Sequence, residues 1–490
     1  MTPAGRAGPA RRHAARAREV LIGAGYSGPR IAERLGVDDM RALDRLAGPV
    51  LARRLDSDSP LDVLVRLLLL GVEVERDVVR AVLHAPFEAW EGLGLVETTA
   101  GRVRARYRMV PHGDLLLRAD WPAFPGRPLR PDHVLGPNPT ASLLADITVR
   151  PRLGSVLDLG TGCGIQALLA ARHADRVVAS DLNPRAVGMA AFNAALNGID
   201  VDCVEGDLFE PVRGQRFDLV VSNPPFVISP DTSLLFRDSA LGGEGISRRI
   251  ISDVAGLLNE TGFCQLLTNW AHVEGVDWRG RLEEAFAGCG CNAWVLELDR
   301  AEPDIYAGRW IQPGTRTAPV FAEALDHWMR YYERERITAI SWCAVTMRRA
   351  SGPRTWIELD EMPAPIRAPA GDHVLRCFDA RELLAGLADD ALLAIRPRLA
   401  PDTRLEHQLS ATGAGWAPVE TRVRLTGGLP VEQAVDPGVA NLLLHSDGRR
   451  SVRELLALAA GEAGVPTDAL APAGVGVIRR LLADAFLLPC

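Results

Sequence analysis

Residues that could do chemistry are concentrated between positions 155 and 230. Asp158 lies in the buried strand pattern SVLDLG, and three glycines follow at alternate positions, Gly160, Gly162 and Gly164. Glycines between a strand and a helix let the backbone approach a ligand closely and leave the first amides of the helix free to bind it. Their GxGxG spacing differs from the GxGxxG fingerprint of dinucleotide-binding proteins, which counts against NAD.

Two further carboxylates stand at the ends of the next predicted strands. Asp181 ends the run RVVAS about 20 residues after the glycines, where an acid can accept hydrogen bonds from both hydroxyls of a ribose. Asp207 ends the following strand, where it can lie near an adenine ring. Either one alone could be a helix cap or an exposed turn residue. Together with the glycines they favour a nucleoside site.

The tetrapeptide Asn223-Pro224-Pro225-Phe226 follows the strand pattern FDLVVS. Its two prolines form a rigid turn that cannot continue the strand. We expect the side-chain oxygen of Asn223 and the carbonyl of Pro224 to accept hydrogen bonds from a substrate NH2 group. The ring of Phe226 can stack on the planar group that carries this nitrogen. If the tetrapeptide stood alone, we would interpret it as an ordinary proline turn that closes a strand. Because it follows the glycine turn and the two carboxylates at the end of a further strand, it indicates a site for chemistry at a nitrogen.

The elements that must position these residues alternate between strand and helix from about residue 130 to about residue 350. Such an alternation predicts an α/β fold with a doubly wound parallel sheet, here ending in a pair of C-terminal strands. In a parallel sheet the glycines, the two carboxylates and the tetrapeptide all follow carboxyl ends of strands. The four features are therefore expected at one edge of the sheet.

The core over residues 155–230 resembles the class I S-adenosylmethionine-dependent methyltransferases, and within them the branch that uses an Asn-Pro-Pro-aromatic motif on planar nitrogens. DLGTGCG is similar to the first motif of that family. The resemblance implies a Rossmann-like fold and S-adenosyl-L-methionine as cofactor. It also implies roles: the methionine moiety would meet Asp158, Gly160, Gly162 and Gly164, the ribose Asp181 and the adenine Asp207, while Asn223 would border the cofactor and, with Pro224 and Phe226, hold the nitrogen to be methylated.

The acceptor is less sharply indicated. SDLNPRAV, NAALNG and GDLFEPV are similar to segments of the HemK-like protein-glutamine N5-methyltransferases, which favours the side-chain amide of a protein glutamine. Those enzymes usually end the motif with Tyr and carry an upstream Pro-Arg-Pro, whereas this chain has Phe226 and Pro137-Asn138-Pro139. Because Phe226 is shared with ribosomal RNA guanine-N2 methyltransferases, the alternative is an exocyclic amine of an RNA or DNA base. A second alternative is a non-catalytic cofactor-binding interaction protein.

No strong general base stands out in the sequence, and the expected mechanism requires none. His133 is the nearest upstream candidate, and a structural role is favoured for it.

Changes in composition and the positions of proline- and glycine-containing segments predict the domain organisation. We expect a mobile Ala- and Arg-rich tail over 1–25, a winged-helix-like domain over 26–125, the methyltransferase domain over 126–350 and a small α+β domain over 351–490. Four arginines alternate along a predicted hairpin around Gly101, and a solvated strand face is favoured for them over a phosphate-binding strip. They are Arg102, Arg104, Arg106 and Arg108.

The composition over 490 residues, 47% hydrophobic and 24% charged, is that of an ordinary globular protein. A net charge of −7 argues against a protein that is basic throughout and coats nucleic acid. The eight scattered cysteines form no CxxC pair, which indicates a reduced, cytoplasmic location and no metal. The most apolar run, residues 61–72, contains Asp62 and Arg66 and is too short to span a membrane. None of these features sets the oligomeric state.

Overall fold

The structure is a computed structural model that describes residues 9–40, 48–83, 87–123, 129–238, 241–311, 317–352, 355–366, 369–412 and 415–490. The chain forms two compact units. Unit 1 comprises residues 1–142, 152–292 and 300–355, and unit 2 comprises residues 143–151, 293–299 and 356–490. Among the described residues, no helix is both long and apolar enough to cross a membrane.

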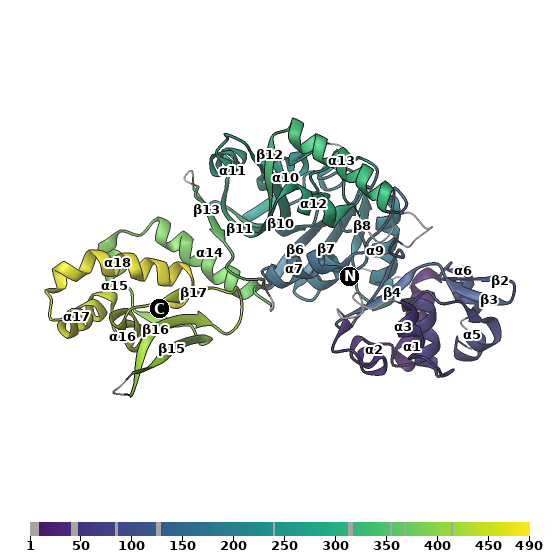
Figure 1. Ribbon diagram of the computed structural model, residues 1–490, viewed down its shortest axis with the longest axis horizontal. Coiled ribbons are helices and arrows are strands. Elements are labelled where there is room, and N and C mark those ends of the chain that lie inside the picture. Colours follow the sequence, from purple (N-terminus) through teal and green to yellow (C-terminus); the bar gives the residue numbers. More distant parts are fainter. Residues whose placement is uncertain are drawn as a thin grey trace, which may run out of the picture. The chain divides into compact units, whose positions relative to one another are not determined.

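The first part of unit 1 is a small helical region with two antiparallel hairpins (Figure 1). Its helices are α1 (Pro9–Gly23), α2 (Gly28–Leu35), α3 (Gly48–Ala52), α4 (Pro60–Leu64) with its continuation η2 (Val65–Leu69), α5 (Arg76–Leu83) and α6 (Phe87–Gly92). The strands β1 (Val74–Glu75), β2 (Val96–Thr99) and β3 (Arg102–Ala105) form a sheet in the order β1-β3-β2, and β4 (Arg108–His112) pairs with β5 (Leu115–Ala119). The predicted hairpin around Gly101 is β2 and β3, with Gly101 at φ +79°.

The prediction of a mobile tail over residues 1–25 is wrong for its described part, because residues from Pro9 to Gly23 form helix α1. Alanine and arginine are both good helix formers, so a composition that resembles a tail also suits a helix. One face of α1 is fully buried in the N-terminal core through Ala14, Ala17 and Leu21. Residues 1–8 lie outside the described part of the chain.

The centre of unit 1 contains six neighbouring strands of an eight-stranded sheet, in the order β8-β7-β6-β9-β10-β12. These strands are β6 (Leu153–Leu159), β7 (Ala174–Asp181), β8 (Asp202–Glu205), β9 (Phe217–Ser222), β10 (Leu258–Val273) and β12 (Ile337–Arg349). The first five are parallel, and β12 runs antiparallel to β10. The strand order reverses between β6 and β9, which confirms the predicted doubly wound, Rossmann-like fold and places its switch point at these two strands.

Helices connect the strands of this sheet and pack against it. They are α8 (Ile165–Ala170), α9 (Pro184–Asn197), α10 (Gly245–Asp253), α11 (Trp278–Phe286), α12 (Pro303–Trp310) and α13 (Ala318–Arg334), with two short 3-10 turns, η3 (Glu210–Val212) and η4 (Val254–Leu257); the first residues of α7 (Pro139–Ile147) also belong to unit 1. Helix α9 begins at the N-cap Asn183, whose side chain accepts a hydrogen bond from the Arg185 amide, and ends at Gly198 in the left-handed conformation. The acidic turn after β7 is thereby tied to the start of a helix.

Unit 2 contains a small α+β arrangement built mostly from the last third of the chain. Its elements are most of β11 (Cys291–Ala301), β13 (Ile357–Glu361), α14 (Gly371–Ala385), α15 (Asp389–Ala394), β14 (Pro397–Leu399), β15 (Thr403–Thr412), β16 (Gly415–Leu425), β17 (Glu432–Ala434), α16 (Pro437–His445), α17 (Val452–Ala463), α18 (Thr467–Ala483) and β18 (Leu487–Pro489). Because β13 pairs in parallel with β11, residues 293–299 belong to unit 2, which the chain order alone does not predict.

Candidate active site

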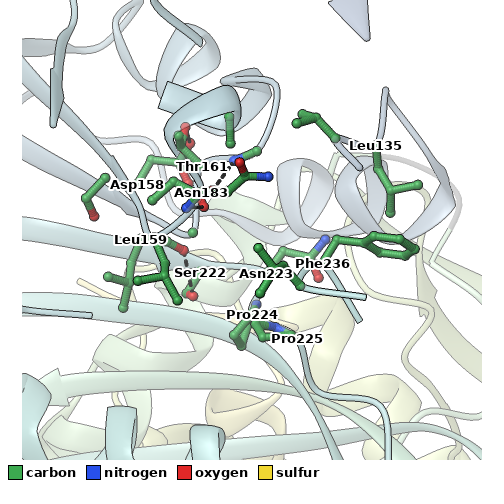
Figure 2. A pocket seen from close by; sticks show the side chains of 18 of the residues that line it. Leu135, Asp158, Leu159, Thr161, Asn183, Ser222, Asn223, Pro224, Pro225 and Phe236 are labelled. Carbon is green, nitrogen blue, oxygen red and sulfur yellow. Dashed lines mark hydrogen bonds between the residues drawn. The ribbon is translucent and has the colours of Figure 1, made fainter. Parts of the chain in front are cut away.

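The register of the sheet brings the four sequence features together. Leu159 at the end of β6 is paired with Ser180 in β7 and with Ser222 in β9. The residues after these positions therefore emerge side by side at the carboxyl edge, at the switch point where open α/β sheets bind ligands. The hydroxyl of Ser222 donates a 2.8 Å hydrogen bond to the Leu159 carbonyl, which ties β9 to β6 at this edge (Figure 2).

A cavity of about 190 Å³ opens at this edge. Most of the sequence-predicted residues line it, namely Asp158, Gly160, Gly162, Asp181, Asp207, Asn223 and Pro224. Gly164 and Phe226 do not line it. The remaining wall comes from segments that the sequence pattern did not single out, including residues 133–136 and the pair Leu235 and Phe236.

The glycine turn has open space where side chains would be. Gly160 and Gly162 have φ angles of +72° and +55°, and a Cβ added to either would meet no atom within 4 Å. The amides of Gly160 and Thr161 both donate to the Ser180 carbonyl at 2.9 Å, so the turn is held against β7. A Cβ at Gly164 would instead lie 3.1 Å from the Cα and Cβ of Ala190. Gly164 thus serves helix packing, while the other two leave room for a ligand.

Asp158 stabilises the glycine turn through hydrogen bonds. Its side chain is almost fully buried, and one carboxylate oxygen accepts hydrogen bonds from the Thr161 hydroxyl at 2.6 Å and from the Ala167 amide at 2.9 Å. Burial raises the pKa of Asp158 to about 7, and the nearby charge of Asp181 acts in the same direction. The carboxyl group therefore connects the turn to the first turn of α8.

Asp181 is ordered by two backbone amides. Gly162 donates to one of its carboxylate oxygens and Asn183 to the other, each at 2.9 Å. Burial raises the pKa of Asp181, and these amide hydrogen bonds oppose the shift. Each carboxylate oxygen has a second lone pair, so the group retains the capacity to accept from two hydroxyls of a ligand. Asp207 lies on the next strand end and is exposed.

Asn223 presents a buried acceptor to the cavity. Its amide nitrogen donates to the hydroxyl oxygen of Thr140 at 3.3 Å. That hydroxyl donates in turn to the Asn138 side chain at 2.6 Å, so its proton is already used and it can only accept from Asn223. The amide orientation is thereby determined, and the Oδ1 of Asn223 is left buried without a donor among the described residues. An unpaired buried acceptor is costly, and an N–H group of a ligand in the cavity, or a water molecule, would satisfy it.

The two phenylalanines that flank this region lie in different surroundings. Phe226 is only 5% exposed, and its ring packs edge-on against Trp310 with centroids 6.4 Å apart. Phe236 is half-buried and lines the cavity on the same side as Asn223, as Figure 2 shows. Phe226, which the sequence predicted to stack on the acceptor, thus packs against α12. Phe236, ten positions later, lines the cavity.

His133 lies in the cavity wall with a largely structural environment. It is 4% exposed, its ring centroid lies 5.6 Å from that of Phe236, and its Nδ1 lies 3.8 Å from Asp120. Burial lowers the pKa of His133, so the ring is neutral near pH 7. These contacts agree with the structural role that the sequence favours.

Arginine side chains near the cavity are paired with carboxylates. Arg185 makes a bidentate ion pair with Asp120, at 2.7 and 2.9 Å. Asp120 also accepts a hydrogen bond from the Val134 amide at 2.8 Å. Arg130 pairs with Asp132 at 2.9 Å. This network fixes the 130–136 segment against α9. It was missed from the sequence because its members lie up to 65 positions apart.

Comparison with known proteins agrees with this geometry. A family model described as "Methyltransferase small domain" matches residues 138–286, and two models described only as domains of unknown function match residues 23–106 and 375–489. A "Release factor glutamine methyltransferase" from Geobacter sulfurreducens is 39% identical over 107 residues, which are 21% of this chain and 37% of that protein. A "Ribosomal RNA small subunit methyltransferase C" from Alcanivorax borkumensis is 33% identical over 134 residues, or 27% of this chain and 37% of its own length.

A third relative is covered over most of its length. It is a "Putative protein N5-glutamine methyltransferase" from Methanocaldococcus jannaschii, 34% identical over 142 residues, which are 28% of this chain and 72% of that protein. These matches and the sheet topology show that the chain belongs to the class I S-adenosylmethionine-dependent methyltransferases, in the branch that carries the methyltransferase small domain.

Proposed function

We propose that this chain is an N-methyltransferase that uses S-adenosyl-L-methionine to methylate the side-chain amide of a glutamine in a protein. One observation carries the proposal: the Oδ1 of Asn223 is a buried acceptor that receives no hydrogen bond from the part of the chain that the structure describes, and Asn223 lines the cavity beside the glycine turn. A primary carboxamide offers two N–H donors on a planar nitrogen, and one of them would satisfy this oxygen.

The residues at the glycine turn suit the cofactor. Open space beside Gly160 and Gly162 accommodates a ligand close to the backbone, and the carboxylate of Asp181 has lone pairs left for ribose hydroxyls. Asp207 borders the same cavity where an adenine would lie. When bound, S-adenosyl-L-methionine supplies a methyl group on a positively charged sulfur, ready for attack by a nucleophile.

The protein's part in the reaction is orientation and electrostatic stabilisation. An amide nitrogen is a poor nucleophile because its lone pair is delocalised into the carbonyl group. A hydrogen bond from its N–H to Asn223, and a second to the Pro224 carbonyl, would hold the nitrogen with its lone pair toward the methyl group. These bonds strengthen as positive charge develops on nitrogen, so they act mainly in the transition state. The product amide forms when that nitrogen loses one proton.

Features of the surface support a protein acceptor over a nucleic acid. The arginines of β3, expected at a phosphate-binding strip in the alternative hypothesis, are paired with carboxylates: Arg102 with Glu75 at 2.6 Å, and Arg104 with Glu97. Phosphate recognition depends on cations that are available to replace counterions. The relatives named for glutamine methylation include the one whose length is best covered among those reported above.

Transfer of tritiated methyl groups into an extract from cells that lack this chain tests the proposal. We expect the label to resist nuclease, to be released by protease, and to be recovered as N5-methylglutamine after enzymatic digestion. Label that is lost to nuclease and survives protease would establish a nucleic-acid base as acceptor instead. Absence of S-adenosyl-L-methionine binding by calorimetry would contradict both forms of the enzyme.

A further inference from the structure

A buried ion pair organises the loop that follows the Asn-Pro-Pro-Phe tetrapeptide. Arg237 and Asp238 are 6% and 7% exposed, and the Arg237 guanidinium donates to the two carboxylate oxygens of Asp238 at 2.6 and 3.0 Å. Asp238 also accepts from the Ser229 hydroxyl and from the amides of Ser233 and Leu234, at 3.0–3.1 Å. The Asp238 carboxylate therefore binds several parts of the loop at once. Removing one partner of a buried ion pair with this many hydrogen bonds is destabilising, because the other charge is left buried and unpaired.

Two helices hold the outside of the same loop. The guanidinium of Arg237 also donates to Asp231 at 3.1 Å, and the indole of Trp328 on α13 donates to that same carboxylate at 3.1 Å. The Ile228 amide donates to the Tyr306 hydroxyl on α12 at 3.1 Å, and its carbonyl accepts from Tyr332 on α13 at 2.8 Å. Both ends of the segment 228–238 are thus anchored in unit 1.

This anchoring determines where the loop's apolar residues lie. Leu235 donates its amide to the Pro131 carbonyl at 3.0 Å, so the loop is joined to the 130–136 segment across the cavity mouth. Phe236, between Leu235 and the buried ion pair, lines the cavity near Asn223 and contacts the His133 ring (Figure 2). Leu135 and Leu235, 37% and 44% exposed, add apolar surface at the same place.

We propose that Phe236 is the specificity-determining aromatic residue that packs against the planar acceptor group, that Arg237 and Asp238 position it, and that Phe226 has a structural role. The inference rests on the proposed function, since it concerns the acceptor side of the same site. It assigns the aromatic contact by location: Phe226 is enclosed beside Trp310, whereas Phe236 is half-buried at the cavity. An aromatic ring offers a flat apolar face that suits a planar amide and restricts its rotation.

The test compares two ligands by calorimetry, so it does not depend on knowing the protein acceptor. One ligand is S-adenosylhomocysteine. The other is a bisubstrate probe in which the 5′ carbon of adenosine is joined through an alkyl amine to a butanamide arm that reaches the acceptor position. For the wild-type chain we expect the probe to bind more tightly than the same molecule without its amide arm.

Phe236→Ala should reduce affinity for the probe by about 10-fold and leave affinity for S-adenosylhomocysteine within about 2-fold. Phe236→Tyr keeps the aromatic face and should retain most of the probe's affinity. Phe226→Leu is the matched control and should leave both ligands nearly unchanged. The inference is overturned if Phe226→Leu removes the amide arm's contribution while Phe236→Ala keeps it, or if Phe236→Ala weakens both ligands equally.

The positioning role has its own readout. Asp238→Asn keeps the side-chain volume and removes the charge that Arg237 needs, so it should weaken probe binding while affinity for S-adenosylhomocysteine changes less. If that variant unfolds, the comparison of the Phe236 and Phe226 variants still decides the inference. A wild-type chain that gains nothing from the amide arm would contradict the proposed function itself. An amide contribution that survives Phe236→Ala would contradict only the inference.

Discussion

The two halves of the candidate site are built differently. The half expected at the cofactor consists of Asp158, the glycine turn and Asp181. The two carboxylates accept hydrogen bonds from backbone amides and from the Thr161 hydroxyl, all within about one strand-turn-helix unit. The half expected at the acceptor is assembled from segments far apart in the chain, as in the Asn223–Thr140 contact over 83 positions, and keeps an acceptor atom that has no donor among the described residues. Paired groups make a rigid binding frame, and the Oδ1 of Asn223 is an acceptor that a ligand could still use.

Replacing Asn223, in the half expected at the acceptor, should have the largest effect on the rate of methyl transfer. For Asn223→Ala we expect the transfer rate to fall by roughly 10²–10³-fold, because a donor–acceptor contact that strengthens in the transition state is lost. Affinity for S-adenosyl-L-methionine, measured by calorimetry, should stay nearly constant. Asn441→Ala in unit 2, where the side chain pairs with Glu462, serves as the control. Normal turnover in Asn223→Ala would show that the orienting role is misassigned.

Asp181→Ala should damage the cofactor half instead. Loss of hydrogen bonds to a charged acceptor predicts a decrease in S-adenosyl-L-methionine affinity of roughly 10–100-fold by calorimetry. Asp175→Ala removes an exposed carboxylate from the same strand, where it pairs with Arg152 at the surface, and should leave affinity unchanged. An Asp181→Ala variant that binds the cofactor normally would refute the ribose assignment.

Within the half expected at the cofactor, Gly162 and Gly164 are expected to have different roles. Gly162→Ala adds a methyl group where no protein atom lies within 4 Å, so we expect cofactor affinity to fall by about 10-fold with a stability loss of about 1 kcal/mol from the positive φ. Gly164→Ala places its Cβ 3.1 Å from Ala190 and should cost about 1–3 kcal/mol of stability, measured by urea denaturation. Equal effects of the two variants on cofactor affinity would contradict this division.

A further effect, on stability alone, is a pH dependence from Asp158. Its folded-state pKa, about 7, lies above the ordinary value of 3.8, so the folded state binds the proton more tightly than the unfolded state. This contribution to stability is present below pH about 4 and is lost as the pH rises to about 7, at about 1 kcal/mol per pH unit. Urea denaturation from pH 4.5 to 7.5 should show this decline in the wild type relative to Asp158→Asn. Parallel curves for both chains would show that the shift is absent.

The residues expected at the cofactor could be singled out from the sequence because their signals are local. Asp158, Gly160, Gly162 and Asp181 follow consecutive strand patterns, and parallel pairing then brings them to one edge of the sheet. Gly164 belongs to the same motif, yet its role in packing against Ala190 depends on where α9 lies. The helix at Pro9–Gly23 was missed for a related reason: composition does not reveal that its alanine face has a core to pack against.

The acceptor half depends on tertiary contacts that no local pattern encodes. Asn223 was identifiable from its tetrapeptide, but the orientation of its amide depends on Thr140 and Asn138. Likewise, the sequence placed the aromatic contact at Phe226, whereas packing against Trp310 encloses that ring and leaves Phe236 at the cavity.

By itself, the sequence determined the fold class and singled out residues that the structure brings together at one cavity, because both follow from strand ends and turn chemistry. Only the tertiary structure decided which polar groups remain without a partner among the described residues and which phenylalanine lines the cavity. Hydrogen-bond satisfaction and burial are properties of neighbours in space, and the neighbours Asn223 and Thr140, for example, lie 83 positions apart in the chain.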